Sequence, residues 1–296
     1  MTKLRAVKPE AIQKRLKLFI YGNAKVGKTT AAIQFPNAYF IDTETGAEQD
    51  KYIEILQQKE SMVWSNREHK NDFDEILEEI KSLLTEKHNY KTVIIDPLTH
   101  LYDDLVDKCA EKLKNSSKEK DATGMEFGRH YSEASKKMKH LVRLLSRLDM
   151  NVIITSHAKN EYGNDMKILG TTFDCYKKMD YLFDLIIEVQ KRGEKRIAIV
   201  KGSRVRGFED TEQFPFSYEI MANKYGKEQL ERDAIPVVLA NIEQVKELTK
   251  LIELFKVPEE VYRKWLDKAD AENLSEMSTD NIQKCIDLLN KKLTNQ

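Results

Sequence analysis

Eight consecutive residues near the N-terminus have the types and spacing that bind phosphate groups. The segment from Gly22 to Thr29, GNAKVGKT, fits the pattern G-x-x-x-x-G-K-[ST]. Its two glycines let the backbone approach a phosphate closely, and successive N–H groups form an anion cradle. Lys28 would place a positive charge near the β- and γ-phosphates of ATP, and the Thr29 hydroxyl would ligate Mg²⁺. The expected nucleotide-binding residues are Gly22, Asn23, Ala24, Lys25, Val26, Gly27, Lys28, Thr29 and Thr30.

The residues on either side of this segment supply the elements that must position it. Residues 16–21 are an apolar run typical of a buried strand, and TTAAIQF, from Thr29 onward, is typical of the first turns of a helix. A strand, a glycine-containing loop and a helix in this order are the context in which the motif binds nucleotide. The sequence therefore predicts an α/β nucleotide-binding core.

An acidic residue ends another predicted strand and can complete the metal site. Thr92–Asp96 is a nearly continuous apolar strand that finishes in an acid. Asp96 is therefore expected to hold Mg²⁺ opposite Thr29. The alternative is an acid that only caps the helix that follows.

The base that activates water must come from another strand end. Pro97 follows the acid of the metal site, at the position where many ATPases carry a catalytic glutamate. In open α/β sheets, ligands gather at the carboxyl ends of the strands. Glu44, just beyond the predicted strand Ala38–Asp42, is the first candidate for the base, and Asp42 is the second.

A histidine and a long polar segment follow the next predicted strand. Residues 151–156 lead to His157, which can contact the γ-phosphate and report its presence. A lone histidine is equally common as a structural residue, so both interpretations stay open. Residues 158–172, AKNEYGNDMKILGTT, are predicted to form a polar loop that leaves the same edge. A loop of this length is more often functional than idle.

Basic residues are densest between Lys191 and Arg206. Predicted strands at 185–190 and 196–200 form a hairpin here, and the stretch contains seven basic residues and one acid. These cations can contact DNA phosphates, or they can reach the nucleotide of a neighbouring subunit. A predicted helix at 129–148 is also basic, and a solvated face explains its charge as well as nucleic acid does.

The pattern changes near residue 234, where strands stop. Three amphipathic helices are predicted at 242–255, 258–268 and 279–293, after a further strand at 214–221. We therefore expect a basic N-terminal arm at 1–15, a core at 16–232 and a helical C-terminal domain at 233–296. Residues 115–128 are predicted to be a polar loop.

Composition excludes several classes of protein. The 296 residues are 41% hydrophobic and 33% charged with a net charge of zero, so bulk charge predicts no polyanionic partner. No apolar run approaches the roughly 20 residues of a membrane span, and the N-terminus lacks the apolar stretch of a signal peptide. Three cysteines far apart in the chain fit a reducing cytoplasm. We expect a cytoplasmic protein without a membrane partner.

The order of these features resembles the RecA-like ATPase core. It is most similar to the AAA-type nucleotide-binding proteins of bacteriophages that act as RecA-like single-strand annealing proteins. The resemblance covers roughly residues 16–220, and location in the host cytoplasm would follow from a phage origin. The segments that carry it are GNAKVGKT (22–29), FIDTE (40–44), TVIIDP (92–97), IITSH (153–157) and RIAIVKGSRVRG (196–207).

The resemblance implies roles for individual residues. Glu44 falls on the catalytic glutamate of RecA-like proteins, and His157 stands where their γ-phosphate sensor is usually glutamine. Residues 158–172 match a DNA-binding loop. Lys201 matches the first lysine of a Lys-x-Lys pair that acts across the subunit interface, whereas Ser203 stands at the second position and Arg204 follows it.

These features together predict an α/β, RecA-like P-loop NTPase core with a mostly parallel sheet and a small C-terminal all-α domain. The predicted function is a Mg²⁺-dependent ATP hydrolase that binds single-stranded DNA and promotes annealing or recombination. It would work as a homo-oligomeric ring or filament with ATP at subunit interfaces, and a single-strand-binding protein is a further candidate partner. The alternatives are a P-loop kinase for a small molecule, a helicase-like motor and a nucleotide switch. The expected catalytic residues are Lys28, Glu44, His157, Lys201 and Arg204, and the expected metal ligands are Thr29 and Asp96.

Overall fold

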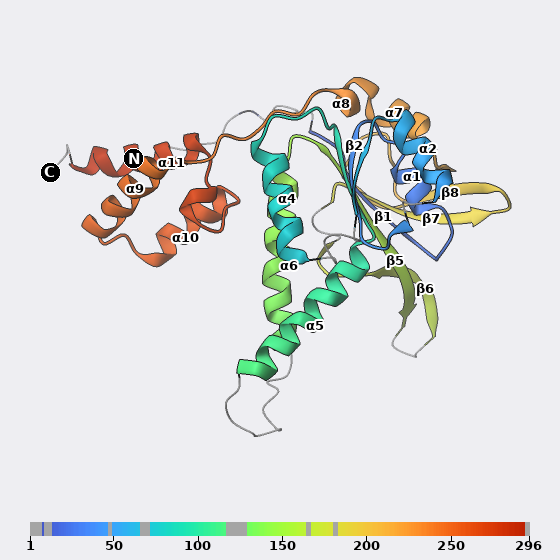
Figure 1. The fold of residues 1–296 in the computed structure, drawn as a ribbon, viewed down its shortest axis with the longest axis horizontal. Helices are drawn as coiled ribbons and strands as arrows, with labels where there is room; N and C mark the ends of the chain where they lie inside the picture. The colour runs from blue at the N-terminus through green and yellow to red at the C-terminus, as the bar shows by residue number, and fades with distance from the viewer. Residues whose placement is uncertain are drawn as a thin grey trace.

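A mostly parallel sheet forms the centre of the molecule (Figure 1). The computed structural model describes residues 8, 14–46, 49–65, 72–116, 129–163, 167–179 and 183–293. Over these residues, nine strands form one sheet in the order β3-β2-β4-β5-β1-β7-β8-β9, with β6 paired to β5. The strands are β1 (Lys17–Gly22), β2 (Ala38–Asp42), β3 (Met62–Ser65), β4 (Thr92–Asp96), β5 (Asn151–Tyr162), β6 (Ile168–Asp174), β7 (Leu185–Arg192), β8 (Lys195–Ser203) and β9 (Gln213–Pro215).

Helices cover both faces of this sheet. The strands from β3 to β7 in the sheet order are parallel, whereas β8, β9 and β6 pair antiparallel with their neighbours. The helices are α1 (Lys28–Ala32), α2 (Asp50–Gln58), α4 (Phe73–Thr85), α5 (Leu98–Ser116), α6 (Arg129–Arg147), α7 (Tyr218–Tyr225), α8 (Lys227–Glu231), α9 (Ile242–Leu254), α10 (Glu259–Lys268), the 3₁₀ helix η3 (Leu274–Glu276) and α11 (Thr279–Leu293).

Alternating residues of β1 reach the two layers of helices. Phe19 and Tyr21 pack into one apolar cluster with α4, α5 and α6. Leu18 and Ile20 pack into a second cluster with residues of α1, α7 and α8 on the other face. Successive strand residues point to opposite faces, so a strand buried on both sides must be apolar throughout. Burying each of these large side chains stabilises the fold by about 1.5–3 kcal/mol.

The register of the parallel strands brings the polar strand ends together. Gly22 at the end of β1 pairs with His157 of β5, and Asp42 at the end of β2 pairs with Asp96 of β4. Parallel strands run in one direction, so these residues lie along one edge of the sheet. The α/β class and the mostly parallel sheet predicted from the sequence are therefore confirmed, and a helical C-terminal region follows them.

Residues 158–172, predicted to be a loop, form most of a β-hairpin instead. β5 continues beyond the sheet to Tyr162 and pairs antiparallel with β6, with His157 opposite Asp174. Only the base of this extension packs on the core, where Phe173 meets Phe19 and Tyr21 edge to face. The prediction was wrong because the outer residues, from Lys159 to Tyr162 and at Ile168 and Leu169, are exposed and show no alternation of polar and apolar residues.

Two other expectations also differ from the structure. The strand expected at 214–221 is limited to β9, because the Ser217 side chain accepts a hydrogen bond from the Ile220 N–H and begins α7. Arg15, expected at the end of the N-terminal arm, is buried and donates to the carbonyl oxygens of Asp149, Gln229 and Arg232. Most of the expected arm and most of the loop at 115–128 lie outside the described residues.

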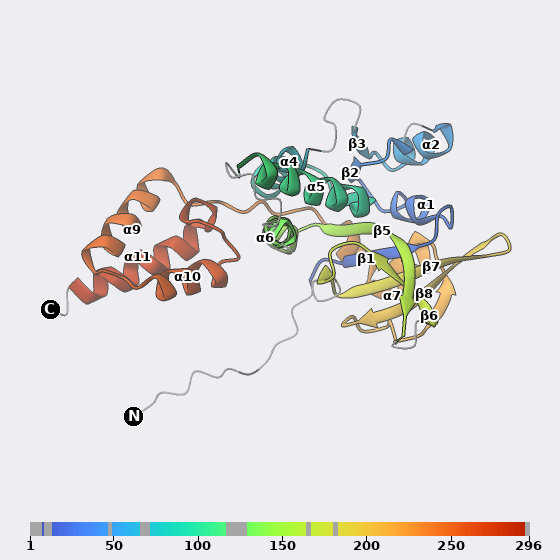
Figure 2. The ribbon, with the colours of Figure 1, turned by 90° about the horizontal axis from the view of Figure 1, so that it is seen from below.

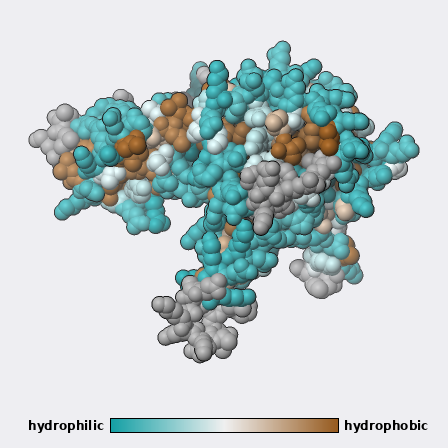
Figure 3. Space-filling view, in the orientation of Figure 1, coloured by the Kyte–Doolittle hydropathy of each residue, from teal (hydrophilic) through white to brown (hydrophobic). Residues whose placement is uncertain are grey.

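The C-terminal helices α9, α10 and α11 enclose an apolar cluster of their own (Figures 1 and 2). They stand beside α4 and α6, to which polar contacts join them. Arg143 of α6 pairs with Asp267 of α10 at 3.1 Å, and Arg147 donates to the Glu276 carbonyl oxygen at 2.7 Å. Figure 3 shows apolar surface over this region. The exposed apolar residues of these helices and of the segment before them include Ile235, Val238, Ile242 and Leu254.

A buried carboxylate is the main polar link between this region and the core. Glu276 Oε1 lies 3.2 Å from His140 Nε2 and 3.7 Å from Lys81 Nζ, and Oε2 accepts from the Glu272 N–H. Burial by itself would raise the pKa of Glu276, but the hydrogen bond from His140 and the other contacts lower it to about 2. Among the described helices, none has the length and apolar content needed to cross a membrane.

We expect Glu276→Gln to loosen the C-terminal helices by about 2 kcal/mol, because it removes charge-assisted hydrogen bonds from a buried position. The folded pKa lies below the ordinary value of 4.5, so the wild-type contribution is complete above that pH and is lost as pH falls toward 2. Hydrogen exchange of α9 and α11 measures the effect, and the exposed Glu253→Gln is the matched control. Equal protection in the two variants would contradict the assignment.

Candidate functional site

The phosphate-binding segment forms a tight turn between β1 and α1. Gly27 has a φ of 98°, a left-handed conformation that favours glycine. Lys28, 8% exposed, donates from Nζ to the carbonyl oxygens of Gly22 at 2.9 Å and Asn23 at 3.0 Å. Burial lowers the pKa of Lys28, while the nearby carboxylates of Asp96 and Glu44 raise it. The ammonium is therefore held inside the loop that it would share with a phosphate.

Asp96 is the buried acid of the site. Its side chain is 6% exposed, and it accepts hydrogen bonds from the hydroxyl groups of Thr155 and Thr29. Burial raises the pKa of Asp96 above its ordinary value, against the lowering effect of these two hydroxyls and Lys28. A hydroxyl and a carboxylate are hard oxygen donors, which Mg²⁺ prefers. The adjoining oxygens of Thr29 and Asp96 therefore fit the metal ion that a phosphate-binding loop normally uses.

Glu44 lies at the same edge and meets two histidines. Its Oε1 is 2.5 Å from His100 Nε2 and 3.1 Å from His157 Nε2. The two imidazole rings stand edge to face, with centroids 5.1 Å apart. The structure thus brings together four residues that the sequence singled out, Lys28, Asp96, Glu44 and His157, and adds His100 to them.

Thr99 fixes the elements that carry the two histidines. It is buried in the first turn of α5, where its hydroxyl donates to the Asp174 carbonyl oxygen at 2.9 Å and lies 3.1 Å from the Ser156 hydroxyl. The backbone N–H of His157 donates to the same hydroxyl oxygen at 3.0 Å. Thr99 therefore holds together the start of α5, the last buried residues of β5 and the end of β6.

Arg196 of β8 covers the phosphate-binding loop from the outside. A Cβ atom placed on Gly27 would lie 2.0 Å from Arg196 Nε, so the guanidinium end packs directly against this glycine. The sequence alone places Arg196 only within the basic stretch from Lys191 to Arg206. Its contact places a cation of the same chain beside the anion cradle.

Lys201 is directed elsewhere in this chain. Lys201 Nζ pairs at 3.2 Å with Glu188, a buried residue that also accepts from Thr171 and Gln190. The hydrogen bond from Gln190 and these other contacts lower the pKa of Glu188 despite its burial. The Arg204 N–H donates to the Asp184 carbonyl oxygen. The Lys201 ammonium is therefore engaged by Glu188 rather than by the phosphate-binding loop of its own chain.

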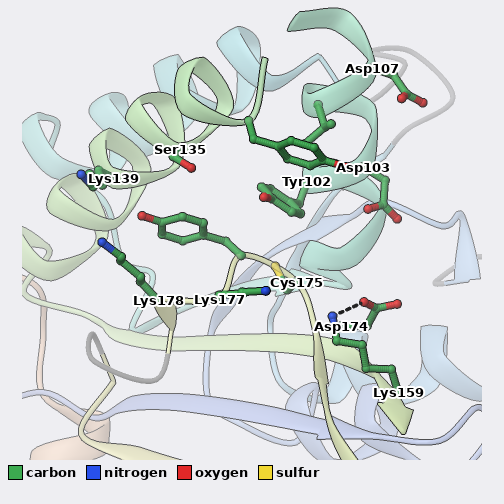
Figure 4. Close-up of a pocket in the computed structure, with 13 residues that line it drawn as sticks. Tyr102, Asp103, Asp107, Ser135, Lys139, Lys159, Asp174, Cys175, Lys177 and Lys178 are labelled. Carbon is green, nitrogen blue, oxygen red and sulfur yellow. Dashed lines mark hydrogen bonds and ion pairs between the residues drawn. The ribbon is translucent and has the colours of Figure 1, made fainter. Parts of the chain in front are cut away.

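A cavity of about 830 Å³ opens between α5, α6 and the residues that follow β6 (Figure 4). Lys159 pairs with Asp174 at its edge, 2.9 Å apart, and Lys177 and Lys178 border it from below. Asp174 also belongs to the Thr99 network, so the cavity adjoins the histidine pair. Its tyrosines and lysines are Tyr102, Tyr131, Tyr176, Lys139, Lys159, Lys177 and Lys178.

Sequence reasoning missed three of these residues, His100, Thr155 and Arg196, and the sequence held a signal for the first two. His100 stands four residues after Asp96, within the first turn of a helix that begins at the same sheet edge. Thr155 follows Ile154, which pairs with Ile95, so strand register places it beside Asp96. Arg196 offered no such signal, because its position depends on how the hairpin of β7 and β8 lies over the loop.

A match to a protein family agrees with the phosphate-binding segment at Gly22–Thr29. Residues 14–215, more than half of the chain, match the model of a protein family described as an AAA domain. A search of curated proteins finds no match. Among solved structures, the crystal structure of the RadB recombinase is similar, with a TM-score of 0.44 and 14% identity over 67% of this chain and 84% of that chain.

We expect Asp96→Asn to stabilise the nucleotide-free protein while weakening its response to Mg²⁺ and ATP. Because the pKa of Asp96 is raised in the folded state, ionising this carboxyl group lowers the stability of the fold. That loss of stability develops as pH rises through the raised pKa. Removing the charge should raise Tm, by about 2–4 °C for each kcal/mol that the buried charge costs.

Thermal unfolding with and without Mg²⁺ and ATP measures both effects. The gain in Tm should shrink as pH is lowered, because the wild-type carboxyl then becomes neutral as well. Asp104→Asn, on the exposed side of α5, is the control. A lower Tm for Asp96→Asn without nucleotide would show that the buried charge is not a cost.

Proposed function

The chain belongs to the AAA domain family, and from this premise we propose that it is an ATP hydrolase that acts on single-stranded DNA. One observation carries the proposal: the ends of β1, β2, β4 and β5 bring Lys28, Thr29, Asp96 and Glu44 to a single edge. These are the groups needed to hold a triphosphate, bind its metal ion and activate water.

Lys28 and the backbone N–H groups of residues 22–30 would hold the phosphates. On binding, the Lys28 ammonium exchanges the carbonyl oxygens of Gly22 and Asn23 for phosphate oxygens. Thr29 and Asp96 would hold Mg²⁺, which supplies positive charge to the phosphate chain when it is bound. Arg196, packed on Gly27, adds a cation to the same loop.

Glu44 would orient the attacking water and take its proton. The water oxygen bonds to the γ-phosphorus, the bond from that phosphorus to the β,γ-bridging oxygen breaks, and ADP and phosphate result. The Glu44 side chain is 42% exposed, so a water molecule can reach its carboxylate from solvent. His157, beside Glu44, would contact the γ-phosphate and pass its presence to β5.

Single-stranded DNA is proposed as the partner because of the cavity beside α5 and α6. Tyrosine rings stack on bases of any sequence, and lysines neutralise the phosphates between them. Tyr131 is 52% exposed there, and Lys177 and Lys178 border the same space. The exposed basic tip of the β7–β8 hairpin offers further phosphate contacts. Annealing or recombination is the reaction that we propose for the bound strand.

A homo-oligomer with ATP between subunits completes the proposal. Apolar residues that stay exposed at 235–254 offer a surface for a second copy. Lys201 and Arg204 are proposed to reach the nucleotide of the neighbouring subunit, although Lys201 pairs with Glu188 in the isolated chain. The single-strand-binding protein and the phage origin stay predictions from the resemblance.

We expect Glu44→Gln to keep ATP binding and to lower turnover by at least about 100-fold, because the amide cannot accept the proton from water. ATP binding by calorimetry and phosphate release measure the two properties separately. Asp42→Asn is the matched control, since Asp42 accepts from the Glu44 N–H at 3.1 Å and is the other candidate base. Normal turnover in Glu44→Gln together with loss in Asp42→Asn would move the role to Asp42.

The test of the whole proposal is ATP turnover with and without single-stranded DNA. We expect DNA binding at low salt and faster hydrolysis. In Lys177→Ala/Lys178→Ala, affinity should fall and the slope of log K against log salt should shrink by about 1.4, since each contact on a single strand contributes about 0.7.

The double variant Lys246→Ala/Lys250→Ala removes two exposed lysines from α9 and should leave this slope unchanged. Absence of DNA binding by the wild-type protein, together with unstimulated turnover, would reject DNA as the partner. Equal losses in both double variants would mean that the cavity is not the binding surface.

A further inference from the structure

Two imidazole nitrogens converge on one carboxylate oxygen at the edge of the sheet. Nε2 of His100, from α5, and Nε2 of His157, from β5, approach the same Oε1 of Glu44, which follows β2. All three atoms lie within 4.8 Å of one another. Three separate elements therefore supply donors to one small volume.

This donor set is that of a transition-metal site. Two histidines and a glutamate are the protein ligands of zinc sites that keep a fourth position open. Donors that lie about 2.0–2.1 Å from a tetrahedral ion are about 3.3 Å from each other. The 3.1 Å between His157 Nε2 and Glu44 Oε1 is close to this spacing, and the 2.5 Å between His100 Nε2 and Glu44 Oε1 must lengthen by less than one ångström. We propose that Glu44, His100 and His157 bind a divalent transition-metal ion such as Zn²⁺.

The site differs in chemistry from the proposed magnesium site. Thr29 and Asp96 offer only oxygen atoms, which suit Mg²⁺, whereas imidazole nitrogens favour later first-row metals. It also differs in access. The side chains of Glu44, His100 and His157 are 42%, 46% and 36% exposed, so an ion reaches them directly from solvent. Asp96, by contrast, is buried.

The elements that carry the histidines are already fixed relative to each other. The Thr99 hydroxyl, next to His100, accepts from the His157 N–H at 3.0 Å and donates to the Asp174 carbonyl oxygen. A site whose ligands are held in place before binding loses less entropy when the ion arrives. Glu44 lies just beyond the end of β2 and outside this hydrogen-bond network.

The bound ion would control hydrolysis, a consequence that rests on the proposed function. A Glu44 carboxylate that ligates the ion cannot take a proton from water, and His157 cannot contact the γ-phosphate. Micromolar Zn²⁺ should therefore stop turnover while ATP stays bound, and a chelator should restore it. The binding site itself does not depend on whether the protein hydrolyses ATP.

Co²⁺ and Zn²⁺ binding to the full, untagged chain tests the proposal. Co²⁺ should give the visible absorption of a four-coordinate site, and Zn²⁺ should displace it with one ion bound per chain. His100→Ala and His157→Ala should each weaken Zn²⁺ binding at least about 100-fold, because a ligand is lost rather than one of its supports. His130→Ala, a histidine of α6 outside the cluster, is the matched control and should bind as the wild type does.

Turnover assays then separate this proposal from the enzymatic one. Zn²⁺ should inhibit the wild type and His130→Ala equally, and whatever turnover His100→Ala retains should resist Zn²⁺. Metal binding without any ATP hydrolysis would leave the site standing and reject the hydrolase. Hydrolysis without Co²⁺ absorption, or Zn²⁺ binding that survives in both His100→Ala and His157→Ala, would overturn the metal site.

Discussion

The charge of Asp96, buried beneath the phosphate-binding loop, is the constraint on which the site depends. An ionised carboxylate in a dry environment is unfavourable unless hydroxyls or cations surround it. Thr29, Thr155 and Lys28 meet that need from the loop and from β5. Their positions require β4 to lie beside β5 and β5 beside β1, which is the strand order observed. The strand order thus places the hydroxyls and the ammonium that the buried Asp96 carboxylate needs around it.

The first turn of α5 is the junction between the nucleotide site and the outer surfaces. It follows the strand that ends in Asp96, presents His100 to Glu44, and binds β5 and β6 through Thr99. The cavity beside α6 begins at Asp174, one hydrogen bond away from that threonine. Any movement of His157 must therefore be transmitted through this junction or break its hydrogen bonds. Energetic coupling between two sites needs such a contiguous element.

Local sequence predicted most of the parallel sheet and helices that cover it, such as α6, but not the contacts that the outer hairpins make. Buried strands such as β4 are nearly continuous apolar runs, and Gly22 with Gly27 marks the turn that follows β1, so these elements could be recognised without the structure. The β5–β6 extension could not, because its exposed outer half has no periodic pattern of polar and apolar residues. The contacts of Arg196 and Lys201 depend on the path of β8 over the loop, which no local pattern encodes.

The packing of Arg196 on Gly27 has a kinetic consequence. A guanidinium group that rests on the loop occupies part of the approach that a phosphate chain must use. In the proposed function, the Arg196 side chain would have to swing outward before a nucleotide could enter. If it returned over the bound triphosphate, it would also slow release, so the residence time of nucleotide would depend on β8 as well as on the loop.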